Sequence, residues 1–171
     1  MTTRPFGERP GMADYGTESP DWRGLKWEWA AERLIPNKNY WVVTVSAGGT
    51  PHALPVWGVW NDDDLRFMFS CSPNAQKVRN IAANPRVVFT VDNTVECVSV
   101  QGTAAPITDP ARVDAWVDQY VEKYGSEVPE GLGDFVRQHA MFEVAPTKAY
   151  AIIEREEEFA LRATRWRFPD A

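Results

Sequence analysis

Cysteine is scarce in this chain of 171 residues, which contains Cys71 and Cys97 and no other thiol. Two cysteines are too few for a disulfide framework, and their separation fits no metal-ligand spacing. We also expect no signal peptide ahead of the folded part. The sequence therefore predicts a cytoplasmic protein in a reducing compartment, without a disulfide scaffold.

Long apolar runs are also missing. No segment approaches the roughly twenty apolar residues that a transmembrane helix needs, so we predict no membrane partner. Cations are in the minority, because 18 Lys and Arg stand against 24 Asp and Glu, for a formal net charge of −6. A chain with no surplus of cations cannot replace phosphate counterions over a large surface, so we predict no nucleic-acid partner.

Tryptophan, in contrast, is abundant, with eight residues in the chain. Trp supplies a large flat apolar surface with one polar group, which suits the wall of a pocket or a subunit interface as well as a core. We expect most of the eight to pack in the core. Hydrophobic residues make up 44% and charged residues 25% of the chain, as in an ordinary globular domain.

The chain divides into two parts by composition. Residues 1–21 are rich in Gly, Pro, Thr and acidic residues and lack apolar periodicity, so we interpret them as a flexible or partner-embracing arm. Residues 22–171 have the periodicity of folded elements and are predicted to form a single cofactor-binding domain.

Patterns of alternation and helical spacing predict a mainly β, α+β fold. Strands are predicted at residues 40–46, 51–60, 65–70, 86–92, 96–105, 141–144 and 148–154. Helices are predicted at residues 27–34, 73–84, 109–125 and 131–139. The acidic run 154–158 is interpreted as a solvated tail. About six or seven antiparallel strands with inserted helices are therefore expected.

Four segments carry a family resemblance. They are Pro51-His52-Ala53-Leu54-Pro55-Val56-Trp57-Gly58-Val59-Trp60, then Lys77-Val78-Arg79-Asn80-Ile81-Ala82-Ala83-Asn84-Pro85-Arg86-Val87, then Val100-Gln101-Gly102-Thr103-Ala104, and finally Ala163-Thr164-Arg165-Trp166-Arg167-Phe168. In this order, over about residues 25–168, they resemble the pyridoxamine 5′-phosphate oxidase-like superfamily, and in particular its actinobacterial flavin- and deazaflavin-dependent oxidoreductases. The resemblance implies an FMN-binding type of split β-barrel and a homodimer. It also implies that FMN or coenzyme F420 binds in grooves between the subunits.

A phosphorylated cofactor needs an anchor, and the start of the predicted helix 73–84 offers one. Lys77 can supply charge there, and Ser70 and Ser72 can supply hydroxyl donors. Cys71, between the two serines, is included in the predicted cofactor site. From the residues alone, a solvated Lys on a polar helix face is an equally good interpretation. The resemblance favours Lys77 as the phosphate contact, with Asn80 as a weaker candidate.

The same segment departs from the family. Relatives often place a small hydroxyl residue and an Arg directly before this Lys, whereas this chain has Ala75 and Gln76. Each lost charge-assisted hydrogen bond is worth about 1.5–3 kcal/mol. The departure therefore predicts either a loosely bound cofactor or a different ligand.

The strand 51–60 is the predicted ledge for the cofactor ring. Pro55 cannot donate to a sheet ladder and so leaves a gap where a ligand can approach, although an edge or bulge proline is the alternative. Val56 and Trp57 continue this surface. Trp57 and Trp60 are three residues apart on one strand and must point to opposite faces, and we predict that Trp57 meets the ligand.

Four further residues complete the predicted cofactor site. Gln101 can hydrogen-bond a pyrimidine edge, and His52 can donate a proton, although a surface or capping role is the common one for a lone His. Arg165 and Trp166 belong to the terminal segment that carries the resemblance, which favours their contact with the cofactor.

No catalytic side chain is required for hydride transfer, because the cofactor supplies the chemistry and the protein supplies positioning. The leading hypothesis is an oxidoreductase that transfers a hydride between reduced F420 and a planar, conjugated small molecule. An FMN-dependent oxidoreductase of the same fold is the first alternative. The second is a non-catalytic protein that binds a flavin, haem or another planar ligand, and the atypical residues before Lys77 favour it.

Overall fold

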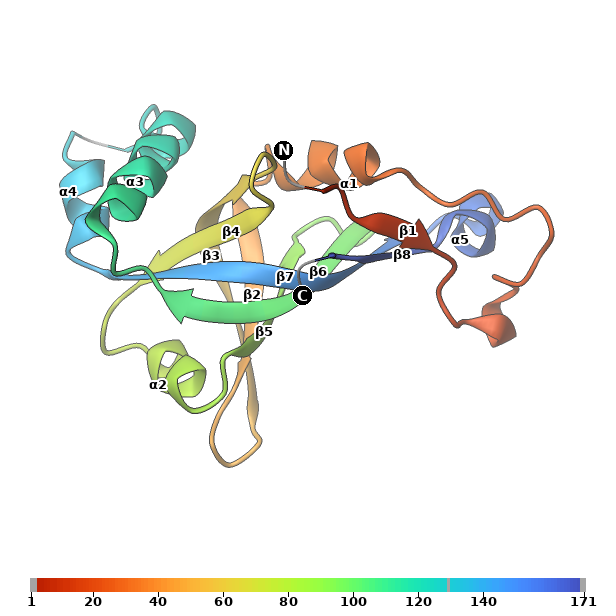
Figure 1. Ribbon diagram of the computed structural model, residues 1–171, viewed down its shortest axis with the longest axis horizontal. Coiled ribbons are helices and arrows are strands. Elements are labelled where there is room, and N and C mark those ends of the chain that lie inside the picture. The colour runs from red at the N-terminus through yellow and green to blue at the C-terminus, as the bar shows by residue number, and fades with distance from the viewer. Residues whose placement is uncertain (1–2, 129, 170–171) are drawn as a thin grey trace.

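The computed structural model describes residues 3–128 and 130–169, and within them eight strands form one antiparallel sheet. The strands are β1 (Phe6–Glu8), β2 (Asn39–Val45), β3 (Pro51–Asn61), β4 (Arg66–Cys71), β5 (Arg86–Val91), β6 (Glu96–Pro106), β7 (Ala140–Ile153) and β8 (Thr164–Arg167). Their order is β1-β8-β7-β4-β3-β2-β5-β6, and pairing of β6 with β7 closes six of them into a barrel (Figure 1). The predicted split-barrel fold is confirmed.

Helices flank the barrel at its ends. They are α1 (Trp27–Leu34), α2 (Gln76–Ala83), α3 (Pro110–Tyr124), α4 (Leu132–Arg137), α5 (Glu156–Arg162) and the 3-10 turn η1 (Ala13–Tyr15). The helices α3 and α4 lie together at one end, and α5 lies with β1 and β8 at the other (Figure 1). Within the described residues, no helix is both long and apolar enough to cross a membrane.

The acidic run near the C-terminus is not the predicted tail. Glu156, Glu157 and Glu158 form the first turn of α5. Carboxylates are favourable in that position because they face the positive end of the helix dipole. The charge run therefore begins a helix that contacts β7 and is not an irregular tail, although residues 154–157 are exposed as expected.

Two apolar clusters lie on opposite sides of the barrel wall. The interior is filled by aromatic rings that include Tyr40, Phe67 and Phe89, with Phe67 and Phe89 stacked at 4.1 Å between ring centroids. The second cluster lies on the outside, where α3 and α4 cover β3, β4 and the start of β7. Trp60 belongs to the interior and Trp57 packs on the outer cluster, as the spacing of three on one strand predicts.

The two predicted closing strands are in fact one continuous strand, β7. Pro146 interrupts the alternation in the sequence, yet it lies within β7 opposite Gly102. The register between β6 and β7 shifts between Gln101 and Gly102, and this irregularity accommodates a residue that has no N–H to donate. A Cβ at Gly102 would lie 2.5 Å from the Ala145 carbonyl oxygen, so the two backbones approach there as only glycine allows.

Part of the predicted N-terminal arm contacts the barrel edge. The three residues of β1 pair with β8, with Phe6 opposite Arg167. The Glu8 carboxylate accepts hydrogen bonds from Arg165 and Arg167, both at 2.6 Å. Residues 1–2 of the predicted arm, and residues 129, 170 and 171 of the predicted domain, lie outside the described residues.

Candidate functional site

The end of β4 and the start of α2 bring together four of the predicted site residues. Lys77 is half-buried in the first turn of α2. Burial raises the pKa of the Cys71 thiol, and the nearby charge of Lys77 partly offsets that rise. Burial raises the pKa of Tyr120 to about 12, and a hydrogen bond with Ser70 partly offsets the rise. Ser72 follows Cys71 and is exposed. The charge of Lys77 therefore lies near Cys71, whose chain neighbours Ser70 and Ser72 carry hydroxyl groups.

The atypical residue Gln76 is part of a hydrogen-bonded chain. Its amide donates to Asn80 Oδ1 at 2.8 Å, and the amide of Asn80 donates to Thr44 Oγ1 at 2.9 Å. The guanidinium of Arg79 donates to Gln76 Oε1 at 2.6 Å and to the Asn74 carbonyl at 3.0 Å. These bonds fix α2 against β2 and place the Arg79 guanidinium across the first turn of the helix.

Three predicted site residues are buried within this chain. Val56 is 8% exposed, Asn80 is 1% exposed and Trp166 is 1% exposed. Trp166 packs edge-on against Trp27, with ring centroids 5.5 Å apart. Their side chains support the walls of the barrel, and direct contact with a cofactor stays a prediction for all three.

Strand β3 carries the predicted ledge. Pro55 is exposed and faces Trp41 on β2, whose side chain is 44% exposed. His52 is half-buried and lies opposite Thr44. Trp57 is half-buried, and its ring stacks on Tyr124 of α3 with centroids 4.6 Å apart and planes at 4°. The ledge is therefore open at Pro55 and backed by a helix at Trp57.

Polar bonds hold the α3 side of this stack in place. The Tyr124 hydroxyl accepts the Gly58 N–H at 3.0 Å and donates to the Lys38 carbonyl at 2.8 Å. The neighbouring Lys123 donates to the Tyr40 hydroxyl and the Gly58 carbonyl, both at 3.0 Å. Burial, with a smaller contribution from the charge of Lys38, lowers the pKa of Lys123 to about 8. Because this ammonium faces inward, it is not available to a ligand on the outer surface.

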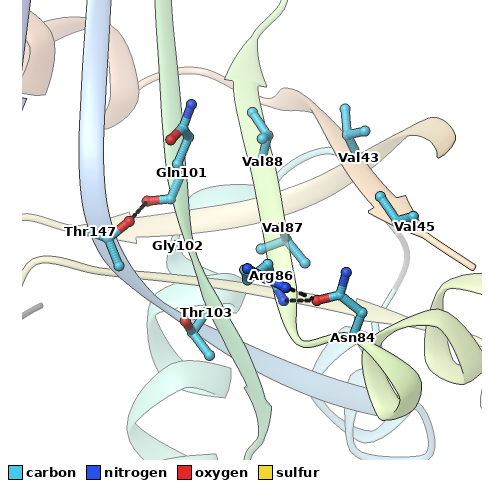
Figure 2. Close-up of a pocket in the computed structure, with 10 residues that line it drawn as sticks. All are labelled: Val43, Val45, Asn84, Arg86, Val87, Val88, Gln101, Gly102, Thr103 and Thr147. Atoms are coloured by element: carbon cyan, nitrogen blue, oxygen red, sulfur yellow. Dashed lines mark hydrogen bonds between the residues drawn. The ribbon is translucent and has the colours of Figure 1, made fainter. Parts of the chain in front are cut away.

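A hollow of about 320 Å³ lies on the outer face of β2, β5 and β6, and we call it the valine hollow (Figure 2). It is lined by Val43, Val45, Asn84, Arg86, Val87, Val88, Gln101, Gly102, Thr103 and Thr147. Arg86 and Asn84 lie side by side at one end, and the Thr147 hydroxyl donates to the Gln101 carbonyl at 3.2 Å (Figure 2). Gln101 is exposed there, and Lys77 is not among the residues that line the hollow.

A second cavity, of about 300 Å³, lies between β3 and the helices α3 and α4. We call it the aromatic pocket, and it is lined by Trp57, Tyr120, Val128, Glu130, Gly131, Leu132 and Phe135. Phe135 is 58% exposed, although its ring lines the cavity. Tyr120 of this pocket also lies close to Ser70 at the end of β4.

Arg165 lies far from that corner within one chain. It faces Tyr150 on β7, whereas Ser70 faces Met141 of the same strand. These two β7 positions are nine residues apart, about 30 Å at the rise of an extended strand. Arg165 is also ion-paired to Glu8 at 2.6 Å. A single chain therefore does not bring Arg165 and Lys77 into one site.

Sequence reasoning missed the helical side of the aromatic pocket. Tyr120 and Tyr124 are four residues apart on the apolar face of α3, and that signal predicts burial without naming the partner strand. For Phe135 and Arg86, no sequence pattern indicated that they would line a cavity. Lys123 looks like a solvated residue on a charged helix, and its inward direction follows from packing alone.

The arrangement is suited to binding more than to acid–base or metal chemistry. Among the described residues, no three His, Cys, Asp or Glu side chains cluster as metal ligands. What the site offers is a cation with hydroxyls at the start of α2, next to apolar and aromatic surfaces on β3. These groups are of the kind that suits a planar ligand with an anionic group.

Comparison with known proteins gives a family and a fold. The family described as pyridoxamine 5′-phosphate oxidase matches residues 28–166. No curated protein matches the chain. A conserved hypothetical protein, Rv2991 from Mycobacterium tuberculosis, is similar in structure at 16% identity and a TM-score of 0.67, over 82% of this chain and 92% of that one.

Two further solved structures share the fold. One is an F420 reductase, similar at 24% identity and a TM-score of 0.54, over 73% of this chain and 98% of that one. The other is HutZ, a haem storage protein from Vibrio cholerae, similar at 20% identity and a TM-score of 0.55, over 70% of this chain and 86% of that one. At these identities the likeness establishes the fold and leaves the ligand open.

Proposed function

The chain belongs to the pyridoxamine 5′-phosphate oxidase family, and on that premise we propose that it transfers a hydride between reduced coenzyme F420 and a planar, conjugated acceptor. The observation that carries the proposal is the proximity of the Lys77 charge to Cys71 at the end of β4, the strand that pairs with β3. An F420 reductase with the same fold supports a deazaflavin as the cofactor.

The residues present fit such a group. Lys77 is half-buried, so a salt contact to a phosphate there is less screened than one on an open helix face. Ser70 and Ser72, on either side of Cys71, would add hydroxyl donors to the phosphate. F420, when bound in its reduced form, supplies the hydride. The protein orients the ring and excludes water from it, and no side chain has to gain or lose a proton.

The exposed part of β3 would orient the ring. Ala53 and Pro55 face outward beside Trp41, and they form an apolar surface without a polar side chain. Pro55 has no N–H, so a ring lying there faces no unpaired backbone donor from that residue. Trp57 would close the ledge, because its stack on Tyr124 restricts the rotation of its side chain.

We propose that the active form is a homodimer. The outer face of β2 and β5 carries Trp41, Val43, Val45 and Val88, which is an apolar surface of the kind that subunits bury. Arg165 is remote from Lys77 within one chain, so a site that uses both needs a second copy. The valine hollow lies on this face and would then be covered by the partner.

Two alternatives stay open. FMN in place of F420 fits the same anchor and ledge. A non-catalytic binding protein is favoured by the residues before Lys77, because Ala75 offers no hydroxyl and Gln76 is engaged with Asn80 and Arg79. A haem storage protein shares the fold, which makes haem the reference ligand for this alternative.

The test is a titration of the purified protein with F420, FMN and haem, followed by absorbance and fluorescence. The proposal expects F420 to bind more tightly than FMN and haem, and expects reduced F420 to be oxidised when the naphthoquinone menadione is added. Tight binding of haem together with no binding of F420 or FMN would overturn the proposed enzymatic function and favour a non-catalytic haem-binding protein.

A loop variant separates the hypotheses further. The double substitution Ala75→Ser and Gln76→Arg adds a hydroxyl and a guanidinium beside Lys77. An enzyme with a weakened anchor should bind F420 or FMN several-fold more tightly after this change. A site adapted to another planar ligand should show no gain. Gln76 is exposed, but its replacement removes its hydrogen bonds with Asn80 and Arg79, so the thermal midpoint of the variant is measured beside that of the parent.

A further inference from the structure

We infer that the aromatic pocket is a binding site for planar heteroaromatic molecules without negative charge, and that it binds their cationic forms best. The claim that the hydride acceptor binds in this pocket rests on the proposed function. As a binding site, the pocket stands on its own geometry and charge.

The shape of the aromatic pocket fits one flat molecule. A protein cavity of about 150 Å³ accommodates benzene, and this one measures about 300 Å³. The volume therefore suits a ligand of two or three fused rings. Trp57, Tyr120 and Phe135 supply aromatic walls from three separate elements, and aromatic walls select flat ligands by stacking.

One wall of the pocket is rigid before any ligand binds. Trp57 is stacked on Tyr124, and the Tyr124 hydroxyl is bonded to the Gly58 N–H and the Lys38 carbonyl. Tyr120 lies against Tyr124, with ring centroids 4.7 Å apart. Preformed walls reduce the entropy that is lost on binding. This wall is thus arranged for a ligand without having to be rebuilt.

The opposite wall is open. Phe135 on α4 lines the cavity, yet its side chain is 58% exposed. Val128 and Leu132 complete the apolar lining on that side. A bound ring would cover Phe135 and remove its apolar surface from water, and this burial would favour binding.

Charge decides which aromatic molecules are accepted. Glu130 is the charged residue among the seven that line the pocket. The segment from Asp118 to Asp134 carries five acidic residues, of which Glu127 is ion-paired with Lys38. Its one Lys, Lys123, points inward to Tyr40 and Gly58. An anionic ligand would meet repulsion here, whereas a cation gains from Glu130 and from the faces of the aromatic rings.

The experiment uses three probes of one shape and different charge, added to the cofactor-free protein. They are 1,6-dimethylquinolinium, 6-methylquinoline and quinoline-6-carboxylate, at a pH near 8 where the second is neutral and the third is an anion. Calorimetry or quenching of Trp fluorescence gives the affinities. We expect the cation to bind best and the carboxylate to bind worst. Equal binding of the carboxylate and the cation would overturn the assignment of charge.

Two variants locate the binding. Phe135→Ala should weaken the binding of the cation and of the neutral probe about three- to ten-fold, which corresponds to the usual contribution of one aromatic contact. Ile35→Ala, also at an exposed apolar residue, is the matched control and should change neither. Glu130→Gln should reduce the preference for the cation over the neutral probe about five-fold. Glu122→Gln, an equal change of charge outside the lining, should leave that preference intact. An unchanged affinity in Phe135→Ala would overturn the site.

The same protein is titrated with F420 and FMN, so that the two proposals fail separately. If the probes bind as expected and neither cofactor binds, the proposed function is wrong and the aromatic pocket stands as a binding site. If F420 binds and the probes do not, the pocket is overturned and the proposed function stands.

Discussion

The rings of Trp57 and Tyr124 lie face to face, 4.6 Å apart with planes at 4°, although one comes from β3 and the other from α3. The stack fastens α3 to the outside of the barrel next to the ledge formed by β3. It also leaves Trp57 among the residues that line the aromatic pocket. This contact therefore contributes both to the stability of the fold and to the wall of the aromatic pocket, and substitutions can separate the two contributions.

Tyr124→Phe keeps the stack and removes the hydroxyl. The buried Gly58 N–H and the Lys38 carbonyl then lose a partner, so the free energy of unfolding should fall by about 1–3 kcal/mol. Urea denaturation measures the change. Tyr15→Phe is the control, because the Tyr15 side chain is 62% exposed, and it should unfold like the parent. An equal midpoint for the Tyr124 variant and the parent would contradict this role of the hydroxyl.

Lys123 predicts a dependence of stability on pH. Its pKa is lowered from 10.5 to about 8 in the folded protein, so between these values the unfolded chain binds the additional proton. The contribution of Lys123 to stability should therefore rise as the pH increases from 8 towards 10. Lys123→Met should remove this rise.

The comparison with Lys123→Met isolates the lysine. Burial raises the pKa of Cys71 and of Tyr120, and both groups lower stability at alkaline pH in parent and variant alike. The measurement is the difference in free energy of unfolding between the two proteins at pH 7, 8, 9 and 10. A difference that stays constant over this range would show that Lys123 has an ordinary pKa.

Lys77→Ala tests the anchor. A charge-assisted hydrogen bond to phosphate is worth about 1.5–3 kcal/mol, so the affinity for F420 should fall about ten- to a hundred-fold while the thermal midpoint stays the same. Fluorescence titration gives the affinity. The control is Lys26→Ala, which removes an exposed Lys at the start of α1 and should bind F420 as the parent does. Equal affinities of the Lys77 variant and the parent would exclude Lys77 as the phosphate contact.

Val43→Lys tests the proposed homodimer. Sedimentation of the parent at micromolar concentration should give a dimer of the 19.3 kDa chain, because the apolar face of β2 and β5 is then buried. A charge at Val43 should convert this dimer to a monomer. Ile35→Lys, at a residue 49% exposed at the end of α1, should remain a dimer. A parent that sediments as a monomer would remove the site between subunits.

The features that sequence predicted are local ones. The opposite directions of Trp57 and Trp60 follow from the alternation of one strand. The proximity of Cys71 and Lys77 follows from their separation of six residues around one turn. In both cases the backbone period alone fixes the geometry.

The features that sequence did not predict depend on pairing between distant segments. Nothing in the pattern around Trp57 names Tyr124, because the stack depends on how α3 crosses the finished barrel. Pro146 hid the continuity of β7, since its place at a register shift is set by β6. The strands β1 and β8 are three and four residues long, too short for an alternation to be recognised.

The pairing of β1 with β8 also bears on the order of folding. Glu8 and Arg165 are 157 residues apart in sequence, and almost the whole chain forms the loop that their contact closes. Closing a loop costs more entropy the longer the free chain between the two residues is. Such a contact therefore stabilises the protein only once the intervening chain is already compact. The barrel would therefore assemble first and the N-terminal strand would join it last. By the same reasoning that strand should detach first, so its amide protons should exchange with solvent while those of the barrel are still protected.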